Sequence, residues 1–198
     1  VGCVGVLWMT IEFRDRPEFI MGREGEQRVA EWLKKFGWYV IPSYDPETEG
    51  RRQEQTAKTI VDYLGRKDVR ILDVGCATGS LLAALQAQGC RNLTGMDPSV
   101  DCAHQAQQAT GCEMLLGTLN GNMRNVGRFD LVILSHVLEH IADVRGALDV
   151  VASLLAEDGA AYLEVPDAAR YLECLSVPFQ DFNSEHINHF SANHLFAA

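Results

Sequence analysis

The sequence predicts an α/β fold in which a mostly parallel sheet carries helices on both faces. Two observations lead to this prediction. From residue 69 onward, short apolar runs alternate with segments whose apolar residues recur at helical spacing. Strands that alternate with helices are typical of βαβ units, in which consecutive strands run parallel. The chain of 198 residues is long enough for one domain with a sizeable core.

Residues 1–50 are predicted to form an N-terminal extension. Its apolar start, 1–11, is too short to cross a bilayer and lacks the basic leader of a signal peptide, so we expect a buried strand there. A helix is expected at 25–36, where four apolar residues recur at helical spacing. A strand at 38–41 precedes a turn-rich linker at 42–50.

Residues 51–198 are predicted to form the main domain. Most of its expected strands are short apolar runs that end before glycine, proline or aspartate. In chain order, the expected elements are helix 51–65, strand 69–74, helix 80–88, strand 92–96, helix 99–109, strand 112–116, strand 129–135, helix 143–156 and strand 159–165. After residue 175 the pattern becomes irregular, and a last helix is expected to start near residue 192.

The charge distribution and the cysteine pattern indicate which kinds of partner and which cellular location to expect. The net charge is −10, and it comes from residues 71–198, which hold 15 acidic and 5 basic side chains. An acidic main domain is a poor candidate for nucleic-acid binding, so a small-molecule or protein-bound substrate is favoured. The six cysteines form no C-x-x-C pair, which disfavours a cysteine zinc site, and their scatter along the chain predicts reduced thiols in a cytoplasmic protein. No membrane insertion is expected, and the sequence does not indicate the oligomeric state.

A glycine-rich turn, DVGCATG at 73–79, follows the strand 69–74 and precedes a helix. Small residues let the backbone approach a ligand closely, and the helix that follows offers unpaired N–H groups. Asp97 ends the next strand, 24 positions after Asp73, where a carboxylate can accept hydrogen bonds from both ribose hydroxyls. The alternative is that the glycines only make a tight turn and that Asp97 only starts another.

Three motifs resemble those of class I S-adenosylmethionine-dependent methyltransferases: ILDVGCATGSLL at 71–82, GMDPS at 95–99 and FDLVILSHVLEHI at 129–141. The resemblance covers 50–198 and implies a Rossmann-like, doubly wound fold with S-adenosylmethionine as cofactor. The residues that it implies around the methionine end of the cofactor are Asp73, Gly75, Cys76, Ala77 and Gly79. Those that it implies at the ribose, the adenine and the floor of the cleft are Asp97, Pro98, Thr118, Leu119 and Ser135.

Two departures from the family pattern affect this site. Ala77 stands where the family usually has a middle glycine. The segment 117–122 lacks the acid that often meets the adenine amino group, so Asn120 is a further candidate for this contact.

The stretch SHVLEH at 135–140 also contains H-x-x-E-H, the pattern of an inverted zinc-peptidase motif. On a helix, His136 and His140 would share one face and grip a metal, while Glu139 activated a bound water. Because the motif begins at a strand end, we instead expect His136 to contact cofactor or substrate. Glu139 and His140 are then expected to cap the turn, and no metal site is predicted.

The segment SEHINHFS at 184–191 resembles a loop of small-molecule methyltransferases. In sugar C-methyltransferases the similar loop carries a histidine and a tyrosine implicated in proton handling; His186 matches the former and His189 replaces the latter. An imidazole has a pKa that suits a proton acceptor near neutral pH. The predicted catalytic residues are therefore His186, His189 and His136, with Glu185 as an orienting partner. The alternative is that this loop only closes over the core.

The predicted function is methyl transfer from S-adenosylmethionine to the oxygen or carbon of a small metabolite, sugar or lipid-linked acceptor. A zinc hydrolase using His136, Glu139 and His140 is one alternative, and a non-catalytic cofactor-binding scaffold is another. We expect Tyr44, Arg51 and Arg52 to help shape the substrate pocket.

The two ends of the chain raise separate expectations. The segment 21–41 resembles the opening of restriction-endonuclease-like domains, but no D…E-x-K metal cluster follows it. The methyltransferase resemblance implies seven strands, of which five core strands are predicted here. The domain is expected to lack its C-terminal helix and β-hairpin, which would leave an apolar sheet edge exposed.

Overall fold

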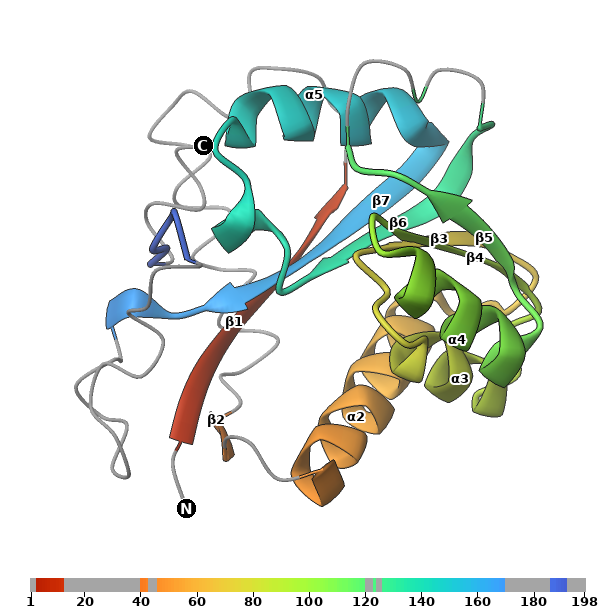
Figure 1. The fold of residues 1–198 in the computed structure, drawn as a ribbon, viewed down its shortest axis with the longest axis horizontal. Helices are drawn as coiled ribbons and strands as arrows, with labels where there is room; N and C mark the ends of the chain where they lie inside the picture. Colours follow the sequence, from red (N-terminus) through yellow and green to blue (C-terminus); the bar gives the residue numbers. More distant parts are fainter. Residues whose placement is uncertain are drawn as a thin grey trace.

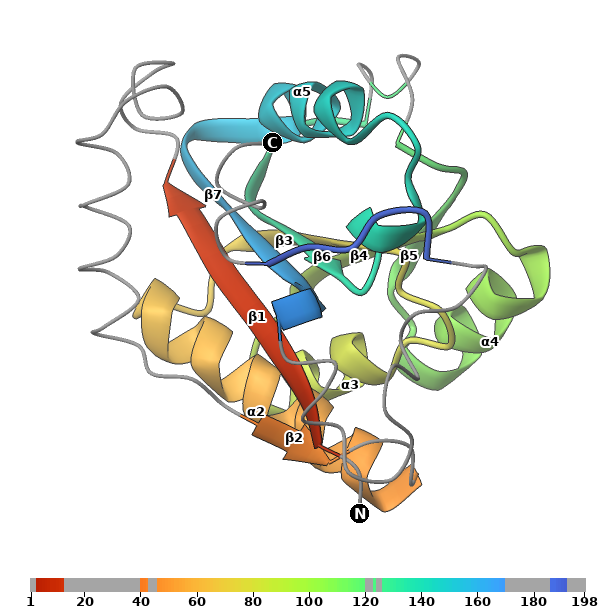
Figure 2. The ribbon, with the colours of Figure 1, turned by 90° about the vertical axis from the view of Figure 1, so that its left-hand side faces the viewer.

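The computed structural model describes residues 3–12, 40–42, 46–119, 123, 126–169 and 186–191. These residues form a seven-stranded sheet with helices packed against it (Figures 1 and 2). The strands are β1 (Cys3–Glu12), β2 (Val40–Pro42), β3 (Arg70–Val74), β4 (Asn92–Asp97), β5 (Glu113–Leu116), β6 (Phe129–Ser135) and β7 (Leu155–Pro166). The helices are α2 (Pro46–Leu64), α3 (Ser80–Ala87), α4 (Val100–Thr110), the short 3-10 turn η2 (Leu138–His140) and α5 (Val144–Leu154).

The sheet has the order β2-β1-β7-β6-β3-β4-β5, and its five strands from β7 to β5 run parallel. The predicted mostly parallel sheet is therefore confirmed. The expected exposed edge beside β7 is not found, because β1 pairs antiparallel with it from Val6↔Pro166 to Glu12↔Ala160. The apolar start of the chain thus supplies a strand that the five predicted core strands did not include.

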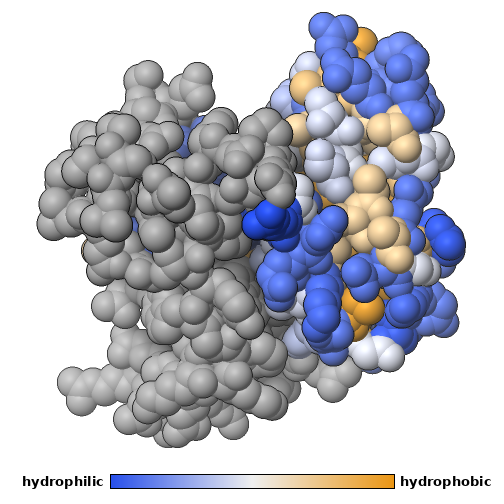
Figure 3. All heavy atoms as spheres, turned by 90° about the horizontal axis from the view of Figure 1, so that it is seen from below, coloured by the Kyte–Doolittle hydropathy of each residue, from blue (hydrophilic) through white to orange (hydrophobic). Residues whose placement is uncertain are grey.

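Helices lie on both faces of the sheet, as predicted. Side chains alternate between the faces along each strand. On β6, Leu131 and Ile133 pack in the core beneath α2, α3 and α4, whereas Val132 and Leu134 pack in the core beneath α5. Figure 3 views the molecule from below, and among its coloured atoms hydrophilic residues predominate, with hydrophobic ones scattered between them.

Three boundaries of main-domain elements differ from the prediction by two or more residues. α2 begins at Pro46, within the stretch predicted to be a linker, because proline suits the first position of a helix. The helix predicted to run to residue 156 ends at Leu154, and β7 begins at Leu155 rather than at 159. The pairing of β7 with β6 is irregular there, stepping from Phe129↔Leu155 to Leu131↔Ala160.

Several predictions lie outside the described residues: helix 25–36, the helix near 192, Tyr44, Asn120 and Glu185. Cys76, Cys90, Cys102 and Cys112 are free thiols. None of the described helices is both long and apolar enough to cross a membrane. The carboxyl ends of β3, β4, β6 and β7 meet at one edge of the sheet, and this edge collects the predicted site residues.

Candidate functional site

The glycine-rich loop turns sharply after β3 because three of its residues have left-handed backbone conformations. The φ angles are +69° at Gly75, +46° at Ala77 and +85° at Gly79. The N–H groups of Gly75 and Cys76 both donate to the carbonyl oxygen of Met96, at 2.7 and 3.0 Å. These bonds fasten the loop to the end of β4, next to Asp97.

The glycines of this loop also permit close packing. A Cβ atom at Gly75 would lie 2.6 Å from Cγ2 of Val137, and one at Gly79 would lie 3.0 Å from Cβ of Ala106 on α4. Turn geometry and packing therefore explain both glycines without any ligand. The observation that points to a ligand is the carboxylate beside the loop.

Asp97 is 8% exposed, and its carboxylate lies at the outer end of β4. The N–H of Ala77 donates to Oδ2 and the N–H of Ser99 donates to Oδ1, each at 2.9 Å. A carboxylate has acceptor sites for about four hydrogen bonds, so sites remain on both oxygens. These remaining sites are suited to the diol of a ribose, a role that stays a prediction for Asp97.

Asp73 lies at the base of the same loop and is 2% exposed. Burial raises the pKa of its carboxyl group to about 8, with Glu164 and Asp97 adding to the rise and Arg52 opposing it. An acid with this pKa is largely protonated at neutral pH, and a cation placed beside it would favour ionisation. The methionine end of S-adenosylmethionine carries such positive charge.

The predicted adenine residues follow β5. The N–H of Gly117 donates to the carbonyl oxygen of Asp97 at 3.1 Å, which brings the exposed Thr118 and the partly buried Leu119 close to this acid. The sequence did not single out Val100 and Leu116, which are 65% and 61% exposed. Such large exposed apolar side chains beside the loop are suited to an aromatic ring.

The stretch 135–140 does not form the metal clamp of the alternative zinc-hydrolase hypothesis. His136 has a left-handed φ of +57°, and only Leu138–His140 form a short 3-10 turn, so His136 and His140 do not share a helix face. Nδ1 of His136 instead lies 3.1 Å from Oε1 of Glu139. Among the residues that the structure describes, the cluster that could hold a metal is Glu139, His140 and His186, whose ligand atoms lie within 4.8 Å of one another.

His136 is positioned between two carboxylates. Its Nε2 lies 3.8 Å from Oε1 of Glu164, in addition to the contact with Glu139. Burial lowers the pKa of His136, but the Glu139 hydrogen bond and the charge of Glu164 outweigh burial, and the pKa is raised overall. The ring is therefore better suited to holding a proton than to accepting one at neutral pH.

The described part of the C-terminal loop, 186–191, is fastened beside η2. The N–H groups of Ile187 and Asn188 donate to the carbonyl oxygen of Glu139 at 2.7 and 3.0 Å. Nδ2 of Asn188 donates to the carbonyl oxygen of Ile141 at 2.6 Å, and the buried Phe190 packs into the core. These contacts hold the loop against the carboxyl end of β6.

The predicted catalytic histidines lie on this side of the site. The rings of His186 and His140 meet edge to face with centroids 5.0 Å apart, and His189 lies 6.3 Å from His186. His136 contacts Glu139, the residue next to His140 in the chain. The structure thus brings the SHVLEH stretch and the later loop together.

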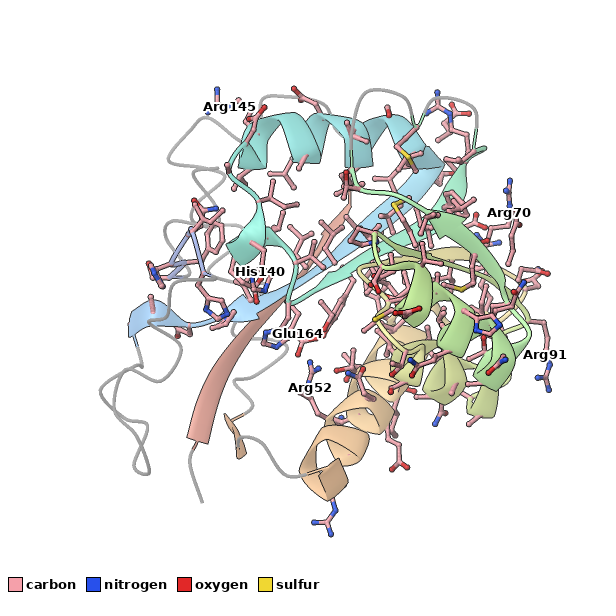
Figure 4. The ribbon with its side chains drawn as sticks, viewed as in Figure 1. Arg52, Arg70, Arg91, His140, Arg145 and Glu164 are labelled. Atoms are coloured by element: carbon pink, nitrogen blue, oxygen red, sulfur yellow. The ribbon has the colours of Figure 1, made fainter. Side chains whose placement is uncertain are left out.

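Sequence reasoning missed Glu164, which is buried at the carboxyl end of β7. Arg52, predicted to shape a pocket, extends from α2 and places Nη1 2.8 Å from Oε1 of Glu164 (Figure 4), whereas Arg51 is exposed. The available signal was a charged residue at the end of the apolar strand GAAYLEV. Such an acid requires a buried partner.

Comparison with known proteins agrees with this geometry. A family described as "Methyltransferase domain" matches residues 22–197. The chain therefore belongs to this family, and its class is that of the class I S-adenosylmethionine-dependent methyltransferases. The match begins within the range 1–50 that the sequence suggested as an extension.

The chain is similar to curated ubiquinone biosynthesis O-methyltransferases. It is 29% identical to the protein of Methylocella silvestris over 99 residues, which cover 48% of this chain and 38% of that protein. It is also 29% identical to that of Rhodopseudomonas palustris over 113 residues, covering 55% and 43%. The aligned region thus spans less than half the length of these relatives.

Solved structures share the fold. The plantazolicin methyltransferase BamL, in complex with a triazolic desmethylPZN analog and SAH, has a TM-score of 0.63 at 14% identity, covering 89% of this chain and 66% of that chain. A TehB-like SAM-dependent methyltransferase from Corynebacterium glutamicum has a TM-score of 0.50 at 24% identity, covering 71% and 70%.

Proposed function

We propose that this chain binds S-adenosylmethionine at the carboxyl edge of its sheet and transfers the methyl group to a small-molecule acceptor. The single observation that carries the proposal is Asp97, whose two oxygens each bind one backbone N–H and keep further acceptor sites toward the glycine-rich loop. The names of the curated relatives favour oxygen over carbon as the methylated atom.

Each end of the cofactor has candidate residues. In this proposal Asp97 and Pro98 hold the ribose, and Thr118 and Leu119 contact the adenine. The methionine end meets the loop and its neighbours, namely Asp73, Gly75, Cys76, Ala77, Gly79 and Ser135. When bound, the cofactor supplies an electrophilic methyl group on a sulfonium, and this chain's residues position the acceptor in line with it.

A hydroxyl acceptor must lose its proton during transfer. We propose that His186 or His189 accepts this proton, since both rings lie on the loop 186–191 that is fastened beside η2. His136 faces Glu139 and Glu164, so we assign it to holding positive charge near the acceptor rather than to proton removal. A carbon acceptor would need the same proton transfer.

Calorimetry with the 198-residue chain tests cofactor binding. Both S-adenosylmethionine and S-adenosylhomocysteine should bind, and Asp97→Ala should lower the affinity for both compounds. Methyl transfer from labelled cofactor into a metabolite extract then tests activity. Failure of the unchanged chain to bind either compound would sink the proposal.

Two alternatives have separate tests. A non-catalytic scaffold would bind cofactor without methylating any acceptor in the extract. A zinc hydrolase would require metal at Glu139, His140 and His186, and stoichiometric zinc in chelator-free protein would support it. The family match favours the methyltransferase over both.

We further propose that residues 1–50 form an extension that precedes a main domain at 51–198. We also propose that the protein is cytoplasmic and has no nucleic-acid partner. The free thiols at Cys76, Cys90, Cys102 and Cys112 support the location. The acidic charge of residues 71–198 supports the absence of a nucleic-acid partner.

A further inference from the structure

Glu164 is 1% exposed, yet its carboxylate is held by three side-chain hydrogen bonds. Arg52 on α2 donates to Oε1 at 2.8 Å, and Ser135 Oγ on β6 donates to Oε2 at 2.7 Å. The hydroxyl of Tyr162, two residues earlier on β7, donates to Oε2 at 3.4 Å. Donors on both oxygens stabilise the ionised form and fix the carboxylate in one orientation.

In the described part of the chain, carboxyl groups outnumber cations around Glu164. Asp73 and Asp97 are also buried at this edge of the sheet, and both Glu164 and Asp97 help to raise the pKa of Asp73. In the described part of the chain, the cations within ion-pair distance of Glu164 are Arg52 at 2.8 Å and His136 at 3.8 Å.

Three other arginines with described side chains do not offset the charge of these carboxyl groups. Figure 4 places Arg52 beside Glu164, whereas Arg70, Arg91 and Arg145 point outward at the periphery, where all three are exposed. Exposed charges are screened by solvent over such separations. Among the described residues, the carboxyl groups at this edge of the sheet therefore exceed the fixed cations, and the edge is suited to a cationic ligand.

We propose that Glu164 is a specificity-determining residue of the cofactor site: together with Asp97, and with Asp73, which a neighbouring cation ionises, it favours the cationic sulfonium of S-adenosylmethionine over the neutral thioether of S-adenosylhomocysteine. This inference rests on the proposed function. Methyl transfer removes the positive charge from the sulfur, so these carboxylates hold the donor more strongly than the spent product. Glu164 need not touch the sulfur, because Coulombic attraction extends over several ångströms in a partly desolvated site.

A purely structural role makes a different prediction. If Glu164 only anchored α2 through Arg52, its loss would loosen the site and weaken the binding of both compounds to the same extent. The informative quantity is therefore the ratio of the two dissociation constants, product over donor. The adenosine and amino-acid groups are common to both compounds, and their contribution cancels in this ratio.

Calorimetry of the 198-residue chain with both compounds measures this ratio. Glu164→Gln keeps the shape of the side chain and removes its charge, and the ratio should fall by about tenfold. Glu164→Asp keeps the charge and should keep most of the preference. Glu157→Gln is the matched control, since it removes the same charge from an exposed residue of β7 and should leave the ratio unchanged.

Arg52→Met provides a second route if Glu164→Gln does not fold. Removing the guanidinium leaves more of the negative charge of Glu164 uncompensated, so the ratio of the two dissociation constants, product over donor, should rise. An unchanged ratio in Glu164→Gln, or a fall in Arg52→Met, would overturn this inference while leaving the proposed function intact. Lack of binding of either compound to the unchanged chain would overturn both.

Discussion

The backbone N–H of Ala77 donates a hydrogen bond to Oδ2 of Asp97 across 2.9 Å. It joins the loop after β3 to the acid that ends β4, so one carboxylate both organises the loop and faces the place expected for the ribose. Because Oδ1 receives the N–H of Ser99, the same carboxylate also fixes the start of α4. Substitutions at Asp97 should therefore affect ligand binding and local structure together.

Asp97→Asn tests this double role. The amide keeps the size of the side chain but has a single acceptor oxygen, so it cannot keep both backbone bonds and the ribose contact. We expect the affinity for S-adenosylmethionine, measured by calorimetry, to fall about 10- to 100-fold, as for the loss of hydrogen bonds to a charged group. Asp101→Asn, an acid in the first turn of α4, is the control and should bind normally. An unchanged affinity in Asp97→Asn would contradict the assignment.

Ala77→Gly should stabilise the protein. Ala77 has a φ of +46°, in the left-handed region. This backbone conformation is unfavourable for a residue with a Cβ atom but not for glycine. We expect the free energy of unfolding to rise by about 1 kcal/mol in urea denaturation. Ala83→Gly, at an exposed position inside α3, should instead lower it by about 1 kcal/mol. Equal losses in both variants would show that the left-handed conformation carries no cost.

Asn188→Ala tests how the loop 186–191 is fastened. The side-chain amide donates to the carbonyl oxygens of Ile141 and Leu138, at 2.6 and 3.3 Å. Its loss leaves partly buried carbonyls without this donor, and we expect the free energy of unfolding to fall by about 1–2 kcal/mol. Amide exchange at Asn188 should also accelerate, because its N–H bonds to Glu139 within the loosened segment.

The exposed neighbour supplies the control for this loop. Ile187 is 59% exposed, so Ile187→Ala should change stability little. Affinity for S-adenosylmethionine should stay the same in both variants, since the loop and the Asp97 site are built from different residues. A loss of cofactor affinity in Asn188→Ala would contradict this separation.

The parallel core and the position of Asp97 at the end of a strand were predictable because both rest on local patterns. Apolar runs that alternate with helical periodicity identified β3 to β7, and Asp97 follows directly from its position at a strand end. The glycine-rich loop was predictable for the same reason, since turn chemistry is set by neighbouring residues. Its left-handed Ala77, however, required knowledge of the backbone angles.

The rest of the site depends on contacts between distant segments. Arg52 and Glu164 are 112 positions apart, and no periodicity predicts that an arginine of α2 meets an acid of β7. The metal-clamp hypothesis failed for a related reason. H-x-x-E-H implies a shared face only on a helix, and the chain at His136 has a left-handed conformation that starts no such helix. β1 was missed as a partner of β7 because antiparallel pairing across such a sequence distance has no local signal.

Asp73 should make the stability of the free protein depend on pH. Its folded-state pKa of about 8 lies above the ordinary value of 3.8, so the folded state retains a proton that the unfolded state releases between these values. Its contribution to stability is full below pH 3.8 and is lost as the pH rises toward 8. Asp73→Asn stays neutral, so its free energy of unfolding should decline less over this range than that of the unchanged chain. Asp149→Asn, an exposed acid on α5, should behave like the unchanged chain.

The same carboxyl group should couple cofactor binding to proton release. A sulfonium beside Asp73 favours the ionised form and lowers its pKa, so binding of S-adenosylmethionine near pH 7 should release protons, whereas S-adenosylhomocysteine should release fewer. Calorimetry in buffers of different ionisation enthalpy measures the number of protons released on binding, because the observed heat changes with the buffer when protons are exchanged. Asp73→Asn should remove most of the difference between the two compounds. Equal buffer dependence for both compounds in the unchanged chain would mean that the charge on sulfur is not felt at Asp73.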